Sequence, residues 1–525
     1  MTIGGARTRA SRVETRLNTC CREGRQRRHE CRRGTHECAR HVLLAVATLF
    51  IGVASGQVVD AAKQGNTPTL RTLLKQHADV NAPAPDGMTA LDWAVRANDL
   101  DMARLLIDAG ANPKFANRYG IAPLSLAATN GSAPMIELLL KAGADPNTAL
   151  PEGETVLMTA ARTGDPAAIK ALLSHDAKVN AKENTLGETA LMWAAAENHP
   201  EAVKVLLEGG ADINAKSTVL SLAPFKWVTS GMVSTTLPRG GWTPLMYAAR
   251  QNATDAARVL ADSKADLNQA DPDGATALVF AIINAHFDLA AMLLDKGADP
   301  NVADETGMAA LYAAVDMHTL GPMISRPAPK LVDKLDAADL VKLLLAHGAN
   351  PNARLKKPVI GRHHDGGDQS MSDGTTPFMR ATKANDIALM KVLLDSGADP
   401  LLTQKDHTTS LMIAASGGAR AGAYATALSV SEATSIQAIQ ICLDHGVDIN
   451  AFNSNGQTAL HRAAQRGADQ IVKFLAEHGA KLDMKDKQNR TPVDMALLPT
   501  PDPGNTPKPG HLATAALLRQ FMATQ

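Results

Sequence analysis

The residues best suited to chemistry in this 525-residue chain form two clusters that could bind a metal ion. The first combines four thiols with two imidazoles, which are the ligands zinc prefers, namely Cys20, Cys21, His29, Cys31, His36 and Cys38. Their spacing lacks the paired ligands of known zinc sites. The second, His363-His364-Asp365, lies in a Gly-rich polar stretch that brings such residues together by chance. We therefore expect no metal in the folded chain.

The sequence also lacks the common catalytic motifs. The chain contains no Gly-rich phosphate loop ending in Lys-Ser/Thr, no Gly-x-Ser-x-Gly and no His-Glu-x-x-His. Segments such as Asp271-Pro272-Asp273-Gly274 have the composition of turns and lack the ligand spacing of a calcium loop. We expect neither enzymatic activity nor a cofactor.

The elements that would position any site follow a repeat of about 33 residues. Thr89-Ala90-Leu91, Ala122-Pro123-Leu124 and Thr155-Val156-Leu157 share one pattern, which continues to Thr491-Pro492-Val493. Apolar residues after each start fall at helical spacing in two consecutive segments. The second segment ends at a glycine such as Gly110, which suits a left-handed helix cap. Two short helices cannot bury their apolar faces alone, so the units must stack.

The repeat resembles the ankyrin repeat family. The resemblance rests on Thr243-Pro244-Leu245-Met246-Tyr247-Ala248-Ala249 and Gly210-Ala211-Asp212-Ile213-Asn214, and it covers residues 57–525. It implies an all-α, helix-turn-helix solenoid of about 12 repeats that binds a protein partner. The family histidine is kept only at His461, while Met158 or Asp92, for example, stands in its place elsewhere. This departure is expected to remove a side-chain hydrogen bond without threatening the fold, because Met packs well in irregular cores.

The N-terminus has the layout of a secretory signal peptide. Residues 42–54 form an apolar run, too short to span a bilayer comfortably, and a small-x-small site ends at Gly56. We expect cleavage after residue 56 and a periplasmic or secreted protein of bacterial origin; the alternative is a membrane anchor formed by uncleaved 42–54. Residues 1–41 are Arg- and Cys-rich, and we interpret them as a disordered extension or as sequence upstream of the actual start.

The charge distribution bears on the partner. Residues 1–41 hold eleven Arg and four Glu, which makes them about +7, and the remainder is −7. An acidic repeat array argues against nucleic acid as the partner. After cleavage Cys442 would be the one remaining cysteine, at a core position of a second helix. We expect a monomer without a stable membrane span.

Five insertions interrupt the repeat, near 217–240, 319–334, 355–374, 419–433 and 499–509. Insertions in solenoids map to loops, often on the binding face. The segment 217–240 alternates apolar and polar residues, which predicts a hairpin finger. The candidate partner-binding residues are Phe225 and Trp227 in this finger, together with Trp242 and Tyr247 just after it. The finger is interpreted either as a partner contact or as a cap on the neighbouring repeat.

These observations favour an exported, non-enzymatic scaffold for protein–protein interaction, with the partner on the concave face and the finger loops. Two alternatives remain open: an accessory or regulatory subunit of a secreted or periplasmic enzyme, and a secreted effector that acts on host proteins.

Overall fold

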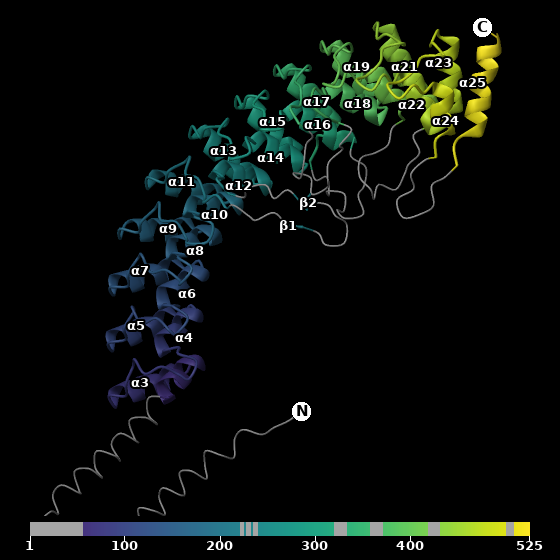
Figure 1. The fold of residues 1–525 in the computed structure, drawn as a ribbon. Coiled ribbons are helices and arrows are strands. Elements are labelled where there is room, and N and C mark those ends of the chain that lie inside the picture. The colour runs from purple at the N-terminus through teal and green to yellow at the C-terminus, as the bar shows by residue number, and fades with distance from the viewer. Residues whose placement is uncertain are drawn as a thin grey trace, which may run out of the picture. The chain divides into compact units, whose positions relative to one another are not determined.

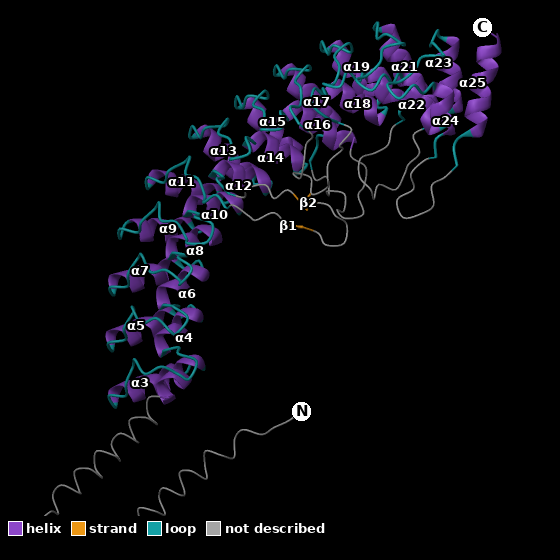
Figure 2. Ribbon diagram, viewed as in Figure 1, coloured by secondary structure: helices purple, strands orange, loops and turns teal. Residues whose placement is uncertain are grey.

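The computed structural model describes residues 56–220, 225–226, 233–234, 240–319, 333–357, 371–417, 431–499 and 509–524. Within these residues the chain forms twelve pairs of short antiparallel helices, as the repeat predicts (Figures 1 and 2). The extension 1–41 and the apolar run 42–54 lie outside the described residues, as does most of each of the five insertions. The all-α fold is confirmed.

The chain divides into two compact units. The first comprises Met1–Asn130 and Pro134–Asp145. A helix over 56–63 opens its described part, followed by α3 (Thr67–Lys75), α4 (Ala90–Arg96), α5 (Leu100–Asp108), α6 (Pro123–Thr129) and α7 (Ala133–Lys141).

The second unit comprises Gly131–Ala133 and Pro146–Gln525. The first helices of its repeats are α8 (Val156–Thr163), α10 (Ala190–Ala196), α12 (Pro244–Arg250), α14 (Ala277–Ile283), α16 (Ala310–Thr319), α18 (Pro377–Ala384), α20 (Ser410–Ala415), α22 (Ala459–Arg466) and α24 (Pro492–Leu497). The second helices are α9 (Pro166–Leu173), α11 (Pro200–Glu208), α13 (Thr254–Asp262), α15 (Phe287–Asp295), α17 (Ala337–Ala346), α19 (Ile387–Asp395), α21 (Glu432–Asp444), α23 (Asp469–Glu477) and α25 (Leu512–Thr524).

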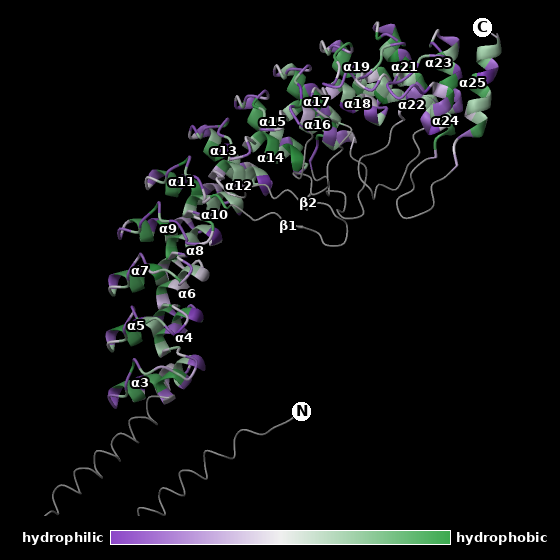
Figure 3. Cartoon of the chain, viewed as in Figure 1, coloured by the Kyte–Doolittle hydropathy of each residue, from purple (hydrophilic) through white to green (hydrophobic). Residues whose placement is uncertain are grey.

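The helices of the second unit pack in two rows. Each first helix contacts the first helix of the next repeat, from α8 through α24, and most second helices contact their neighbours in the same way. The core lies between the rows, where Leu172 and Leu206 are fully buried. Figure 3 shows hydrophobic residues concentrated on the helices and hydrophilic residues at many of the turns. Stacking therefore buries the apolar faces that one pair leaves open.

Most repeats begin with the same cap, although α6 follows Ala122, which makes no side-chain cap hydrogen bond. The hydroxyl of Thr155, for example, accepts a hydrogen bond from the backbone N–H of Met158, and Thr89, Thr189, Thr243 and other repeat-start threonines do the same. This contact satisfies one of the free N–H groups at the helix start. The recurring threonine is thus explained by helix capping.

The second helices end in a left-handed residue. Gly110, with φ +88°, occupies this position as expected. His77, Asp176 and Lys264 take the same conformation, with φ between 56° and 69°. An L side chain is strained there, so these three repeats lose some of the stability that glycine provides elsewhere.

An asparagine bridges successive repeats. The amide of Asn180 donates to Gly210 O (3.1 Å) and accepts from Asp212 N (2.8 Å), and Asn352 bonds Gly397 O and Asp399 N in the same way. The motif asparagine therefore forms hydrogen bonds with a backbone carbonyl and a backbone N–H just beyond the second helix of the next repeat. Leu401 stands in this position one repeat later and is exposed.

The prediction that Met in place of the family histidine removes a hydrogen bond is wrong in part. The Sδ atoms of Met158 and Met192 accept from the backbone N–H of the threonine three residues earlier, at 3.4 Å. Asp92 accepts more strongly from Thr89 N, at 2.7 Å. At His461 the second ring nitrogen also contacts Arg490 O, at 3.2 Å, so this side chain bridges to the next connector as well.

Candidate interaction surface

The finger at 217–240 grows out of an ordinary connector. In a plain connector, Asp271 N donates to Ala275 O across a tight turn. At the finger, Ser217 N donates to Trp242 O (3.0 Å) and Gly241 N donates to Ser217 O (3.2 Å). The insertion therefore lies between two strands that stay paired at its base.

Within the finger, β1 (Phe225–Lys226) pairs antiparallel with β2 (Val233–Ser234), with Phe225 opposite Ser234. The predicted hairpin is confirmed. At its base, Gly240 has φ +96° and packs so closely on the Thr218 carbonyl that a side chain would collide with it. The base is a paired and closely packed platform for a long connector, the arrangement in which loops commonly carry binding residues.

The second finger repeats this construction. Leu355 N donates to Thr375 O (2.9 Å) and Gly374 N donates to Leu355 O (2.8 Å), which reproduces the backbone pairing at the first finger. Leu355 is buried. Both extended connectors thus start from the same place in their repeats.

Aromatic side chains fill the base of the first finger. The ring of Trp242 meets Tyr247 and Phe280 edge to face, with centroids 5.6 and 5.2 Å away, and the Arg250 guanidinium lies 5.1 Å from the Trp242 centroid. Tyr247 is buried, and burial raises the pKa of its phenol. The Trp242 indole N–H is buried and has no hydrogen-bond partner among the described residues. Trp193 packs against the same cluster.

Exposed apolar side chains surround this base on neighbouring connectors. Leu186 is 38% exposed and Val219 is 50% exposed, and their connectors are joined by a hydrogen bond from Thr218 N to Leu186 O. Gly241 lies against both Val219 and Pro272, and Pro272 is also exposed. An apolar cluster of this kind on a polar surface is a candidate contact for another protein.

Two ion pairs join α16 to the following repeat. Arg380 Nε lies 2.6 Å from Asp316 Oδ1, and the two side chains are 3% and 13% exposed. His318 Nε2 lies 2.9 Å from Asp386 Oδ2. This contact raises the pKa of His318 and lowers the pKa of Asp386. Both pairs flank the insertion near 319–334.

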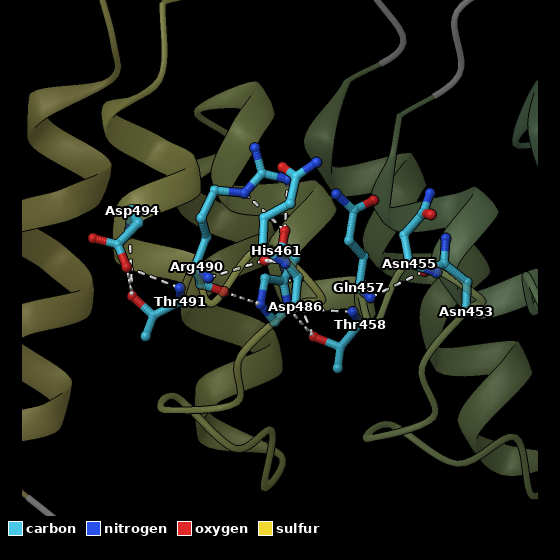
Figure 4. A network of polar contacts seen from close by, with 10 residues as sticks. Asn453, Asn455, Gln457, Thr458, His461, Asp486, Arg490, Thr491 and Asp494 are labelled. Atoms are coloured by element: carbon cyan, nitrogen blue, oxygen red, sulfur yellow. Dashed lines mark hydrogen bonds and ion pairs between the residues drawn. The ribbon is translucent and has the colours of Figure 1, made fainter.

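The polar network around His461 is structural (Figure 4). Its ring lies between Thr458 and the Arg490 carbonyl, and Asp486 accepts from the Arg490 guanidinium at 2.6 and 2.8 Å. Asp486 also accepts from the backbone N–H groups of its own turn. Burial lowers the pKa of His461, which favours the neutral ring that these contacts require. The carboxylate of Asp271 binds its turn in the same way, which confirms the turn interpretation of the Asp-x-x-Gly segments.

The remaining candidates for a reactive or metal-binding site are Cys442 and the clusters of metal-ligating side chains. Cys442 is buried, and burial raises the pKa of its thiol to about 12, so it is an unreactive core residue. No group of three or more metal-ligating side chains occurs among the described residues. His363, His364 and the N-terminal cysteines lie outside them. In the part of the chain that is described, no helix combines the length and the hydropathy that crossing a bilayer requires.

The four predicted partner-binding residues have different placements. Trp242 and Tyr247 are brought together at the base of the finger, one partly exposed and the other buried. Phe225 lies on β1, and Trp227 lies outside the described residues. The sequence analysis missed Leu186, Val219 and Pro272. Their shared signal is an apolar residue in a connector that is otherwise polar.

Comparison with known proteins agrees with the helix pairs. Profiles described as ankyrin repeats match residues 58–149, 124–217, 225–318 and 443–496, and a single ankyrin repeat matches 373–405.

Individual relatives share parts of the chain. Alpha-latroinsectotoxin-Lt1a of Latrodectus tredecimguttatus is 33% identical over 121 residues, which are 23% of this chain and 7% of the toxin. Notch-regulated ankyrin repeat-containing protein A of Danio rerio is 38% identical over 76 residues, 14% of this chain and 68% of the relative. The B-cell lymphoma 3 protein homolog of Mus musculus is 31% identical over 180 residues, which are 30% of this chain and 37% of the relative. The match to the toxin spans a small part of its length.

Proposed function

The chain belongs to the ankyrin repeat family, and on that premise we propose that it is an exported, non-enzymatic scaffold that binds a protein partner through the finger at 217–240 and the surface at its base. Ankyrin repeats imply a protein–protein interaction scaffold. The proposal adds to this role the location of the partner contact on the chain and the compartment in which the protein acts.

One observation carries the location: the finger is long, apolar in sequence, and held by a paired and packed base. The backbone bonds between Ser217 and the Gly241–Trp242 segment fix where the finger leaves the array. The aromatic cluster includes Trp242, and the preceding residue, Gly241, lies against the exposed Val219 and Pro272. A loop on a rigid base loses less conformational entropy on binding than a free loop does.

Export is the second element of the proposal. It is supported by the apolar run at 42–54 and by the small-x-small site that ends at Gly56, directly before the first repeat of the sequence pattern. Cleavage there leaves the first repeat intact.

The test is affinity capture from the exported fraction of the source organism with tagged chain 57–525. The control bait carries a short Gly-Ser linker in place of residues 221–239, which leaves the paired base in place. A partner retained by the first bait and absent from the second supports the proposal. A partner retained equally by both baits would show that the finger is a structural cap.

An enzyme recovered in the same capture, with activity that depends on this chain, would identify an accessory subunit. A host protein as the binding partner would identify an effector.

A further inference from the structure

A row of asparagine side chains joins successive repeats of the second unit. Each accepts a hydrogen bond from a backbone N–H just beyond the second helix of the following repeat, and the row consists of Asn147, Asn180, Asn214, Asn268, Asn301, Asn352 and Asn450. Asn180, Asn301 and Asn352, for example, also donate to the carbonyl two residues before that N–H. A carboxamide has both a donor and an acceptor. The backbone at these places is therefore arranged to bind one carboxamide.

Leu401 interrupts the row. It takes the position that Asn352 and Asn450 hold in the flanking repeats, but an apolar side chain can make neither hydrogen bond. The groups that an asparagine would bind there are Gly446 O and Asp448 N, and neither has a hydrogen-bond partner among the described residues. Both residues are exposed. These two groups, called the open backbone pair below, are accessible to another molecule.

Two exposed apolar side chains flank the open backbone pair. Leu401 is 56% exposed, and Phe452 is 61% exposed. Phe452 directly follows the turn that Ala451 N closes on Asp448 O, at 3.2 Å. A leucine at position 401 gives up two hydrogen bonds and leaves apolar surface in water, so it does not stabilise the array. A residue that costs stability in this way is expected where binding requires it.

We propose that the open backbone pair binds the side-chain carboxamide of an asparagine or glutamine on a protein partner. This assignment rests on the proposed scaffold function and adds a second contact, separate from the finger at 217–240. The partner's amide donates to Gly446 O and accepts from Asp448 N, as the Asn352 amide does in its own repeat at 2.9 and 2.8 Å. Leu401 and Phe452 contact the apolar atoms beside it.

The two backbone groups also decide against a charged occupant. A carboxylate has no donor for the Gly446 carbonyl, and an ammonium group has no acceptor for the Asp448 N–H. The side chain of Asp448 adds a negative charge beside the site, because its carboxylate accepts only from the backbone N–H of Asn450. A neutral amide satisfies both groups without repulsion.

The test is nuclear magnetic resonance of the full chain labelled with 15N-aspartate, titrated with the blocked peptide acetyl-Leu-Asn-Leu-amide. We expect a saturable shift of the Asp448 amide resonance. The Asp399 amide, which is already bonded to Asn352, is the internal reference and keeps its position. The control peptide carries aspartate in place of its asparagine and is expected to leave Asp448 unshifted.

Leu401→Asn supplies the carboxamide from within the chain. This variant is expected to lose the peptide response and to melt about 1 °C or more above the wild type, because it regains the two hydrogen bonds. Leu512→Ala removes another exposed leucine, on α25, and is the matched control that keeps the response.

Three results would overturn the site: no saturable shift of the Asp448 amide, an equal shift with the aspartate peptide, or an unchanged response in Leu401→Asn. With a captured partner, Leu401→Asn is expected to weaken binding by about tenfold or more although it raises stability. A partner that binds this variant as tightly as the wild type contradicts the site. The scaffold function then still stands, because it is tested separately by replacing the finger.

Discussion

The ion pair between Asp316 and Arg380 offers a direct test of how the repeats are held together. Both side chains are nearly buried, and the Nε–Oδ1 distance is 2.6 Å. Removing one partner leaves the other charged group desolvated, which costs about 3–5 kcal/mol. Asp316→Ala should therefore destabilise strongly. The double variant Asp316→Ala/Arg380→Met replaces both charged groups and should recover most of that loss, because an apolar pair of similar size is often tolerated.

The assay is hydrogen exchange read by mass spectrometry, because a repeat array can open locally before it unfolds globally. We expect faster exchange in α16 and α18 of the Asp316→Ala variant, with α8 to α11 close to the wild type. Lys342→Ala is the control: it breaks an exposed pair with Asp339 and should cost about 0.5 kcal/mol or less. If Asp316→Ala behaves like this control, or if the double variant loses as much stability as Asp316→Ala and the single variant Arg380→Met together, the pair does not join the repeats.

Three further predictions concern the core, the pH dependence and the N-terminus. Leu172→Ala or Leu206→Ala should destabilise by about 2–5 kcal/mol, because each side chain is fully buried; urea midpoints equal to the wild type would contradict the packing. The His318–Asp386 pair should contribute most at mildly acidic pH. His318 has a pKa raised above its ordinary 6.5, so its contribution is complete below 6.5 and lost as pH rises through the raised value. Asp386 has a pKa lowered from 3.8, so its contribution is present above 3.8 and lost as pH falls through the lowered value. Between pH 5.5 and 8.5 the wild type should therefore lose more stability than His318→Gln, and equal losses would show that the pair does not titrate in this way. N-terminal sequencing of exported protein should give a start close to Gln57, whereas a start upstream of Val42 would refute the signal-peptide interpretation.

Local features of the fold could be predicted from the sequence because their causes lie within one repeat. The threonine caps, the left-handed Gly110 and the hairpin at β1 and β2 each depend on residues a few positions apart. Leu172 and Cys442 are buried as the helical periodicity indicated.

Contacts between repeats could not be predicted from the sequence in the same way. Asp316 and Arg380 are separated by two insertions, and their pairing depends on how the helices of successive repeats stack. The contact of Trp242 with Phe280 also joins two repeats. It places Trp242 in a packed cluster, so Trp242→Ala should lower stability as well as any affinity. The sequence alone identifies Trp242 only as a candidate partner-binding residue.

Partner binding through the finger at 217–240 is tested most directly by the affinity of a captured partner for the Trp227→Ala variant, measured by titration calorimetry beside the melting temperature. A tryptophan anchor buried in a partner commonly contributes about 2 kcal/mol or more, which corresponds to roughly thirtyfold in Kd. If the finger binds the partner, Trp227→Ala shows that loss of affinity with an unchanged melting temperature. An unchanged Kd with a lowered melting temperature would contradict it and make the finger a structural cap.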